Sequence, residues 1–179
     1  AKLAAVRLVN YWEKRKKVFS ERCYQPLTLR TLEHEIPLIS SGLHQLLGKD
    51  SNGRAILAID ASLRNKSKDS FEAVTRVIWY FFHCLIEDVE TQKRGFVLLA
   101  LCKHAQFNNF DPSLMSAFNE FERECFPIRI VSLHMCHPRP FFRAILPISK
   151  FALGRRMRAR LCFHSGSDRV VVEKLSMYG

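Results

Sequence analysis

The sequence has no apolar run long enough to cross a bilayer. Its longest run, residues 96–102, has the length of a strand, whereas a transmembrane helix needs about 18 or more apolar residues. Glycine and proline are scarce, with 7 of each among 179 residues, while 47% of the residues are hydrophobic. This composition excludes a collagen-like, low-complexity or disordered chain and predicts a packed globular protein of ordinary domain size.

Paired cysteine spacings are also missing. The 6 cysteines are scattered along the chain, and several lie in apolar runs, where a free thiol behaves as a small hydrophobic side chain. We therefore expect a reducing compartment, the cytoplasm.

The motifs of common enzyme classes are absent as well. No Gly-x-Ser-x-Gly or Gly-x-Gly-x-x-Gly pattern occurs. A resemblance to a phosphate-binding loop at residues 42–49 fails because five residues, not four, separate Gly42 from Gly48, and because Asp50 replaces the expected hydroxyl residue. Acidic pairs lie beside basic residues on predicted helix faces, as solvated charges do. We predict a non-enzymatic protein with no catalytic residue and no cofactor.

Two histidines and two cysteines on predicted strands could either bind a metal or be buried strand residues, and the metal site is the weaker interpretation. His134 and Cys136 alternate on one predicted strand, and Cys162 and His164 on another, so the four could face one another if the strands pair in register. Without a Cys-x-x-Cys spacing, buried strand positions are favoured and no metal is predicted.

Positive charge is what the chain has in excess, with a formal net charge of +11. No acidic residue lies between Glu124 and Asp168. The basic residues of that window are Arg129, Arg139, Arg143, Lys150, Arg155, Arg156, Arg158 and Arg160. They alternate with large apolar side chains, a combination that favours an anionic membrane surface; the alternative is a core helix with a solvated basic face. Nucleic acid is disfavoured because no nucleic-acid-binding motif or row of stacking aromatics accompanies the charge.

The chain is predicted to have two parts, a helical N-terminal lobe at residues 1–48 and a main domain at residues 49–179. In the lobe, Leu8, Trp12 and Phe19 have helical spacing within residues 3–19, and residues 48–53 read as a turn-rich linker. Predicted strands cover residues 55–60, 96–101, 130–135 and 160–164, with helices between them, the first opened by Asp69 and Glu72 as a capping box. This alternation predicts an α/β fold with a mostly parallel sheet.

Four segments carry a resemblance to a known family. They are Asp88-Val89-Glu90-Thr91-Gln92 leading through Gly95 into a strand, Asp111-Pro112-Ser113 opening a helix, Phe126-Pro127-Ile128-Arg129-Ile130 before a strand, and Arg160-Leu161-Cys162-Phe163-His164. In this order and spacing the chain resembles a CRAL-TRIO (Sec14-like) lipid-binding domain, in the branch of alpha-tocopherol transfer protein and cellular retinaldehyde-binding protein.

The resemblance implies a mixed, mostly parallel sheet that forms the floor of an apolar cavity, closed by a mobile gate helix at residues 139–153. It implies a set of ligand-binding side chains: Ile78, Phe82, Phe96, Leu98, Ala100, Phe126, Ile128, Ile130, Leu133, Phe142 and Ile145. It further implies that Arg129, Arg156 and Arg160 bind phosphoinositide headgroups at the mouth of the cavity.

Some positions depart from the family pattern. Ile128 replaces the acid of phosphatidylinositol binders, residues 101–104 replace the usual strand end, and the sequence stops before the family's closing segment, so we expect a shortened domain.

The implied function is to bind one lipophilic molecule of the tocopherol, retinoid, sterol or phospholipid class and to transfer or sense it at anionic membranes. The protein is expected to be a monomer in the cytoplasm that associates peripherally with membranes. The alternative is a protein-interaction or nucleic-acid-binding module that uses the basic surface without a lipid.

Overall fold

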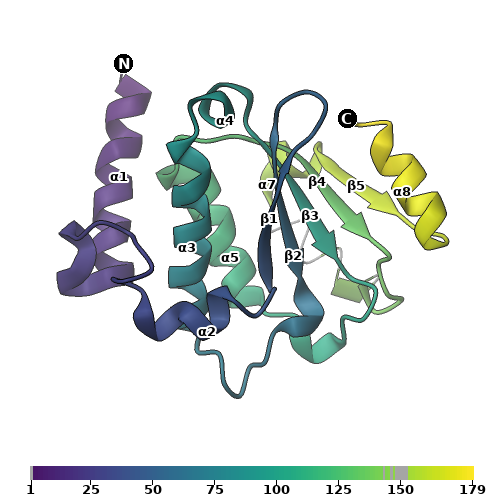
Figure 1. Ribbon diagram of the computed structural model, residues 1–179, viewed down its shortest axis with the longest axis horizontal. Helices are drawn as coiled ribbons and strands as arrows, with labels where there is room; N and C mark the ends of the chain where they lie inside the picture. The colour runs from purple at the N-terminus through teal and green to yellow at the C-terminus, as the bar shows by residue number, and fades with distance from the viewer. Residues whose placement is uncertain (1, 143, 146, 148–152) are drawn as a thin grey trace.

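A single five-stranded sheet organises the molecule. The computed structural model describes residues 2–142, 144–145, 147 and 153–179. The strands are β1 (His44–Lys49), β2 (Ala55–Asp60), β3 (Phe96–Leu101), β4 (Ile130–Cys136) and β5 (Leu161–His164), and they follow one another across the sheet in sequence order (Figure 1). β1 is antiparallel to β2, whereas the other neighbouring pairs are parallel. The predicted α/β fold with a mostly parallel sheet is confirmed.

Helices cover the sheet in layers. The α-helices are α1 (Lys2–Phe19), α2 (Ile36–Ile39), α3 (Phe71–Glu87), α4 (Val89–Arg94), α5 (Pro112–Glu120), α7 (Gly154–Arg158) and α8 (Asp168–Ser176). Shorter helical turns are η1 (Ser20–Tyr24), η2 (Glu33–Glu35), η3 (Ala61–Leu63), η4 (Phe107–Asn109) and the π-helical η5 (Phe121–Cys125). Figure 1 shows α3 and α5 between α1 and the strands, with α8 beside β5 at the other end. Among the described residues, no helix has the length and apolar character to span a bilayer.

The helices that cross over the sheet begin at polar caps. The Ser70 hydroxyl accepts a hydrogen bond from the Ala73 amide at 3.1 Å and opens α3, so the cap lies one residue after the predicted Asp69. Asp111 opens α5 as predicted, with its carboxylate accepting from two backbone amides and Pro112 in the first turn. These caps fix the residues at which α3 and α5 begin.

Helix α1 buries a different stripe from the predicted one. Tyr11, Arg15 and Phe19 are buried, whereas Leu8 and Trp12 are exposed. The buried residues are spaced i, i+4, i+8, so they share one face of the helix. The Arg15 guanidinium is tolerated there because it donates to the Tyr11 hydroxyl at 2.8 Å and to the Gln25 carbonyl at 2.5 Å.

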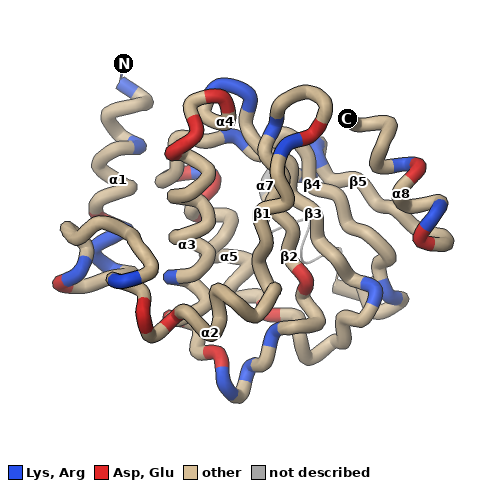
Figure 2. Tube along the Cα trace, in the orientation of Figure 1, with Lys and Arg blue, Asp and Glu red and all other residues tan. Residues whose placement is uncertain are grey.

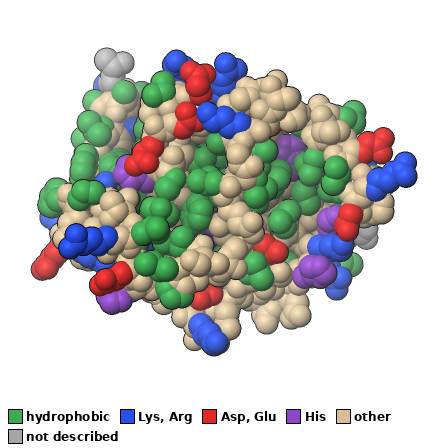
Figure 3. Space-filling view, in the orientation of Figure 1, with side chains coloured by type: hydrophobic (Ala, Val, Ile, Leu, Met, Phe, Trp, Pro, Cys, Tyr) green, Lys and Arg blue, Asp and Glu red, His purple; other side chains and the backbone are tan. Residues whose placement is uncertain are grey.

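Part of the predicted linker is strand β1, which forms a hairpin with β2. The Asp50 carboxylate closes the turn by accepting from the amides of Asn52 at 2.9 Å and Arg54 at 2.8 Å. Hydrophobic side chains lie on both sides of this edge strand (Figure 3), and its own Leu46 and Leu47 are exposed. Because β1 runs across the predicted boundary at residue 48, the division into a lobe and a main domain stays a prediction.

Candidate functional site

An apolar cavity of about 240 Å³ lies against the face of the sheet that α3 and α5 cover. Its walls come from α3, α5, all five strands and the loops that follow β2 and β3. Strand parity explains the floor, because Leu98 on β3, Leu133 on β4 and Leu161 on β5 are aligned across the parallel register and point to one face. The cavity exceeds the roughly 150 Å³ engineered void that binds benzene and is somewhat smaller than a typical drug-sized site. It therefore suits a compact apolar guest.

Five of the predicted ligand-binding residues line this cavity. They are Ile78, Leu98, Ala100, Leu133 and Phe142. Three come from strands, where the predicted period of two puts alternate residues on one face. Their contact with a ligand stays a prediction.

The other six predicted residues do not line the cavity, and all of them except Ile145 belong to the hydrophobic core cluster. Phe82, Phe96, Phe126, Ile128, Ile130 and Ile145 are buried and are not among the cavity-lining residues. The Phe82 ring packs on Phe96 at 5.5 Å and on Phe126 at 5.0 Å between ring centroids. Tyr11 of α1 adds a ring 5.6 Å from Phe126. This aromatic cluster fills the space beneath α1, and the contact of its members with a ligand stays a prediction.

Several lining residues were not predicted from the sequence. Leu114, Met115 and Phe118 on α5 line the cavity, and their spacing i, i+1, i+4 is the helical signal that could have found them. Ile59 on β2 lies beside Ala100 in the parallel register. The lining also includes the polar residues His44, Arg64, Gln106, Asn109 and Asp111. Of these, the sequence singled out only Asp111, and as a helix cap rather than as a lining residue.

Aromatic side chains mark the rim of the cavity at the start of the predicted gate. Residues 142, 144–145 and 147 are helical, and Phe141 stacks on Phe142 at 4.5 Å and contacts Phe107 at 6.1 Å. Phe107 is 65% exposed. The remaining gate residues 143, 146 and 148–152 lie outside the described residues.

The predicted arginines meet at the amino edge of the parallel strands. Arg129 precedes β4 and donates to the Arg94 carbonyl at 3.3 Å, while Arg160 precedes β5 and donates to the Ile130 carbonyl at 2.6 Å. Arg156 is exposed on α7. Figure 2 shows Lys and Arg positions along this edge near α4. The structure therefore brings these separated positions to one basic surface.

One carboxylate lies within the basic surface. Glu122 is mostly buried and its Oε1 lies 3.8 Å from Arg160 Nη1. Burial raises the pKa of Glu122, although Arg160, Arg7 and Arg123 oppose that rise by favouring the carboxylate. Arg7 also donates to the carbonyls of Phe126 and Arg123 at 2.8 and 3.1 Å. Arg7 and Arg123 are thus part of the surface that sequence analysis missed.

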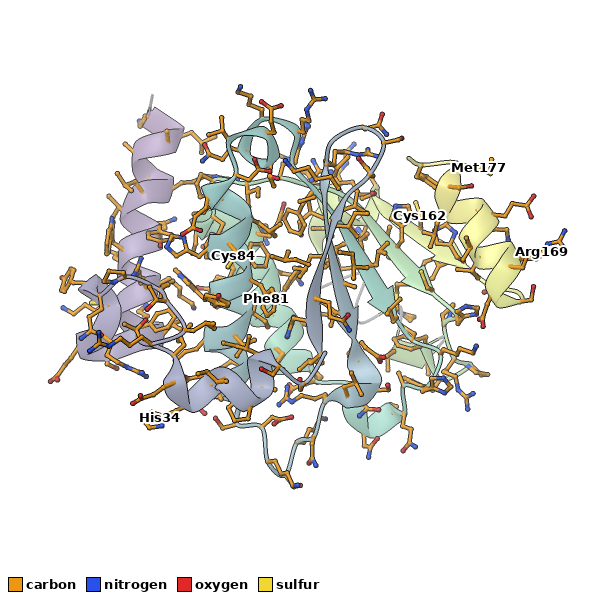
Figure 4. All side chains as sticks on the ribbon, viewed as in Figure 1. His34, Phe81, Cys84, Cys162, Arg169 and Met177 are labelled. Atoms are coloured by element: carbon orange, nitrogen blue, oxygen red, sulfur yellow. The ribbon has the colours of Figure 1, made fainter. Side chains whose placement is uncertain are left out.

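A hydrogen-bonded histidine pair occupies the opposite face of the sheet, beneath α8. His134 Nδ1 lies 2.7 Å from His164 Nε2, and His134 Nε2 lies 2.8 Å from the Ser132 hydroxyl. Cys162 is aligned with His134 in the strand register and faces α8 in Figure 4. Both histidines are buried, and among the described residues there is no group of three or more His, Cys, Asp or Glu that could hold a metal ion.

Acid should destabilise the fold through its buried histidines. Burial lowers the pKa of His44 and of His134 to about 4, from 6.5, and also lowers that of His164. A histidine with a depressed folded pKa gives full stability above about pH 6.5 and loses it as the pH falls toward 4, and for His44 this amounts to about 3 kcal/mol. Urea midpoints at pH 7.5 and 5.5 measure the loss.

A matched pair of variants assigns this pH dependence. His44→Gln should flatten the slope of stability against pH, because a neutral amide replaces the buried imidazole. His34→Gln, at an exposed position, should leave the slope unchanged. An equal slope in all three proteins would contradict the assignment.

Sequence comparison decides the family. The sequence model of the CRAL/TRIO domain matches residues 39–176. The chain belongs to the CRAL/TRIO family. The expected family is thereby confirmed, and the family match includes β1 and extends through α8.

Relatives of this CRAL/TRIO chain include Clavesin-1 of Xenopus laevis, 29% identical over 125 residues that make up 68% of this chain and 38% of the relative. Clavesin-2 of Homo sapiens is 26% identical over 125 residues, with the same two shares, 68% and 38%. The chain thus spans less than two fifths of the length of these relatives. The crystal structure of Sfh5 has the same fold, with a TM-score of 0.59 at 10% identity, and the match covers 85% of this chain and 56% of Sfh5.

Proposed function

We propose that this CRAL/TRIO chain binds one small lipophilic molecule in its cavity and exchanges it at anionic membranes, as a peripheral protein of the cytoplasm. The observation that carries the proposal is the cavity of about 240 Å³ with an almost wholly apolar wall. Membership of a lipid-binding family supports it.

Burial alone supplies the affinity for such a guest. Each 100 Å² of apolar ligand surface removed from water stabilises the complex by about 2.5 kcal/mol. A hydrocarbon body therefore binds without a catalytic group or a cofactor. In this proposal the guest is exchanged past the rim near Phe141 and Phe142, and these two rings enter the lipid surface during exchange.

Native mass spectrometry of the purified chain tests the binding. We expect a co-purifying lipophile of one copy per chain, or uptake of one after incubation with a lipid extract. A chain that stays at its apo mass after both treatments, while folded by circular dichroism, would contradict the proposal.

Membrane docking is assigned to the basic surface. Three arginines near lipid headgroups contribute about 1 kcal/mol each before screening, or about 3 kcal/mol together. That is reversible docking, and it leaves the chain free to shuttle.

Removing these charges should weaken docking without affecting binding of the guest. We expect the triple variant Arg129→Ala, Arg156→Ala, Arg160→Ala to bind phosphoinositide-containing vesicles about 10- to 100-fold more weakly in co-sedimentation at low salt. The matched control removes three exposed charges elsewhere, Arg30→Ala, Lys68→Ala and Arg169→Ala, and should lose much less. Equal losses would mean that net charge, not this surface, drives docking. Tighter binding of the wild type to DNA than to vesicles at matched salt would contradict membrane docking.

A further inference from the structure

The cavity has one polar end, at the carboxyl edge of the parallel strands. Arg64 follows η3 after β2, and Asn109 and Asp111 follow β3 through η4. The Asn109 amide nitrogen donates to the Arg64 carbonyl at 3.1 Å and so ties the two loops together. Ligands of open parallel sheets commonly bind at this edge. The rest of the wall is almost entirely apolar.

Arg64 is buried there with donors left over. Its side chain is 6% exposed, and Nη2 donates to the Asp69 carbonyl at 3.1 Å. Nε and Nη1 have no hydrogen-bond partner among the described residues. Unpaired donors on a buried charge are costly, and a structure retains them where something pairs with them.

His44 lies close enough to this guanidinium to feel its charge, and it adds a third unpaired polar atom. Its ring stacks on Phe81 at 5.5 Å, in the space between α3 and β1 where Figure 4 labels Phe81. Nδ1 of His44 has no partner among the described residues. The polar end therefore offers buried hydrogen-bonding atoms that have no partner among the described residues.

The charge of Arg64 is already balanced. Asp111 Oδ2 lies 3.6 Å from Arg64 Nη2, and the other oxygen of Asp111 accepts from the amides of Ser113 and Leu114. A ligand carboxylate would bring a second negative charge close to Asp111, and buried like charges repel. A neutral oxygen adds no charge and still accepts a hydrogen bond.

We infer that the ligand is a lipophile with an uncharged oxygen acceptor, a carbonyl or a hydroxyl, which accepts a hydrogen bond from the Arg64 guanidinium while the hydrocarbon body fills the apolar part of the cavity. This inference rests on the proposed function and names its ligand class. It disfavours a pure hydrocarbon, which leaves the donors unpaired, and a fatty acid anion.

A series of ligands with one chain length tests the inference. Decane, 2-decanone, 1-decanol and decanoate compete with a fluorescent lipophile bound to the wild-type chain. We expect 2-decanone to bind about 10- to 100-fold more tightly than decane, the range of one hydrogen bond to a charged donor. Arg64→Met should reduce the ratio of the affinities for 2-decanone and decane to below about threefold, because it weakens binding of the ketone alone.

The control is Arg15→Met, which removes a buried arginine that also has an unpaired Nε but does not line the cavity. It should keep the wild-type ratio. If Arg64→Met does not fold, the infrared carbonyl band of labelled 2-decanone bound to the wild type replaces it. A shift to lower frequency than in hydrocarbon solvent supports the hydrogen bond, and an unshifted band contradicts it.

The remaining outcomes separate the two proposals. Equal affinities for decane and 2-decanone in the wild type would overturn the head-group inference and leave lipophile binding intact. Tighter binding of decanoate than of 2-decanone would overturn the neutral class. Failure of the wild type to bind the fluorescent lipophile or any member of the series would overturn the proposed function itself.

Discussion

Replacing Ala100 with tryptophan is expected to abolish loading of the lipophilic guest while the chain stays folded. Ala100 lines the cavity from β3 and lies between Ile59 and Met135 on the neighbouring strands. An indole at this position projects into the empty volume, so it displaces guest rather than core atoms. We expect guest affinity to fall by at least about tenfold, since lost contact area equal to two methylenes is worth about 1.6 kcal/mol. The urea midpoint should change little.

The matched control for this variant is Leu99→Trp, the next residue on the same strand. Successive side chains of a strand point to opposite faces, so this indole leaves the cavity free. Native mass spectrometry compares guest occupancy in the two variants. Full occupancy in Ala100→Trp would show that the guest binds elsewhere, and loss in both would show that tryptophan on β3 disturbs the sheet.

Gly95→Ala is expected to cost the fold about 3 kcal/mol or more in free energy of unfolding. Gly95 connects α4 to β3 with a φ of +79°, a region that disfavours side chains. An added Cβ would overlap the Arg129 carbonyl oxygen and lie 2.8 Å from Val131 Cγ2. The Phe96 amide donates to that same carbonyl at 3.0 Å, so the clash separates β3 from β4 at the edge that carries the basic surface.

Gly48→Ala separates backbone strain from this clash. Gly48 has a φ of +95° but no atom within 4 Å of an added Cβ, so only the backbone term remains, about 1 to 2 kcal/mol. Urea unfolding gives both free energies. If Gly95→Ala costs no more than Gly48→Ala, the close approach of the two strands is absorbed elsewhere.

The four parallel strands were predictable because buried parallel strands are continuous apolar runs, whereas the antiparallel edge strand β1, which is largely exposed, was not predicted. Residues 55–60 and 96–101 were predicted with the bounds that β2 and β3 have. The N-terminal helix was also predicted, but not which of its faces is buried. Its apolar residues outnumber the positions that α3 can cover, so Trp12 is exposed while Arg15 is buried with polar partners.

Helix α3 shows why only some of the cavity-lining residues were predicted. The apolar stripe of α3 is wide, and Ile78 and Phe82 are one turn apart on it. Ile78 faces the cavity, whereas Phe82 meets the rings of Phe96 and Phe126. A stripe shows that a residue is buried, but the partner that buries it comes from distant parts of the chain.

Composition and local pattern by themselves determined the α/β class, a mostly parallel sheet and the position of the arginines along the chain, while the order and spacing of four motifs carried the resemblance to the family. Tertiary structure alone decided where empty space remains, because a void is the volume that packed neighbours leave unfilled and no single segment encodes it. It alone also brought Arg64 and Asp111 from separate loops to one end of that void, 3.6 Å apart. The polar end of the cavity therefore follows from strand order and loop contacts, which hydrophobic periodicity does not report.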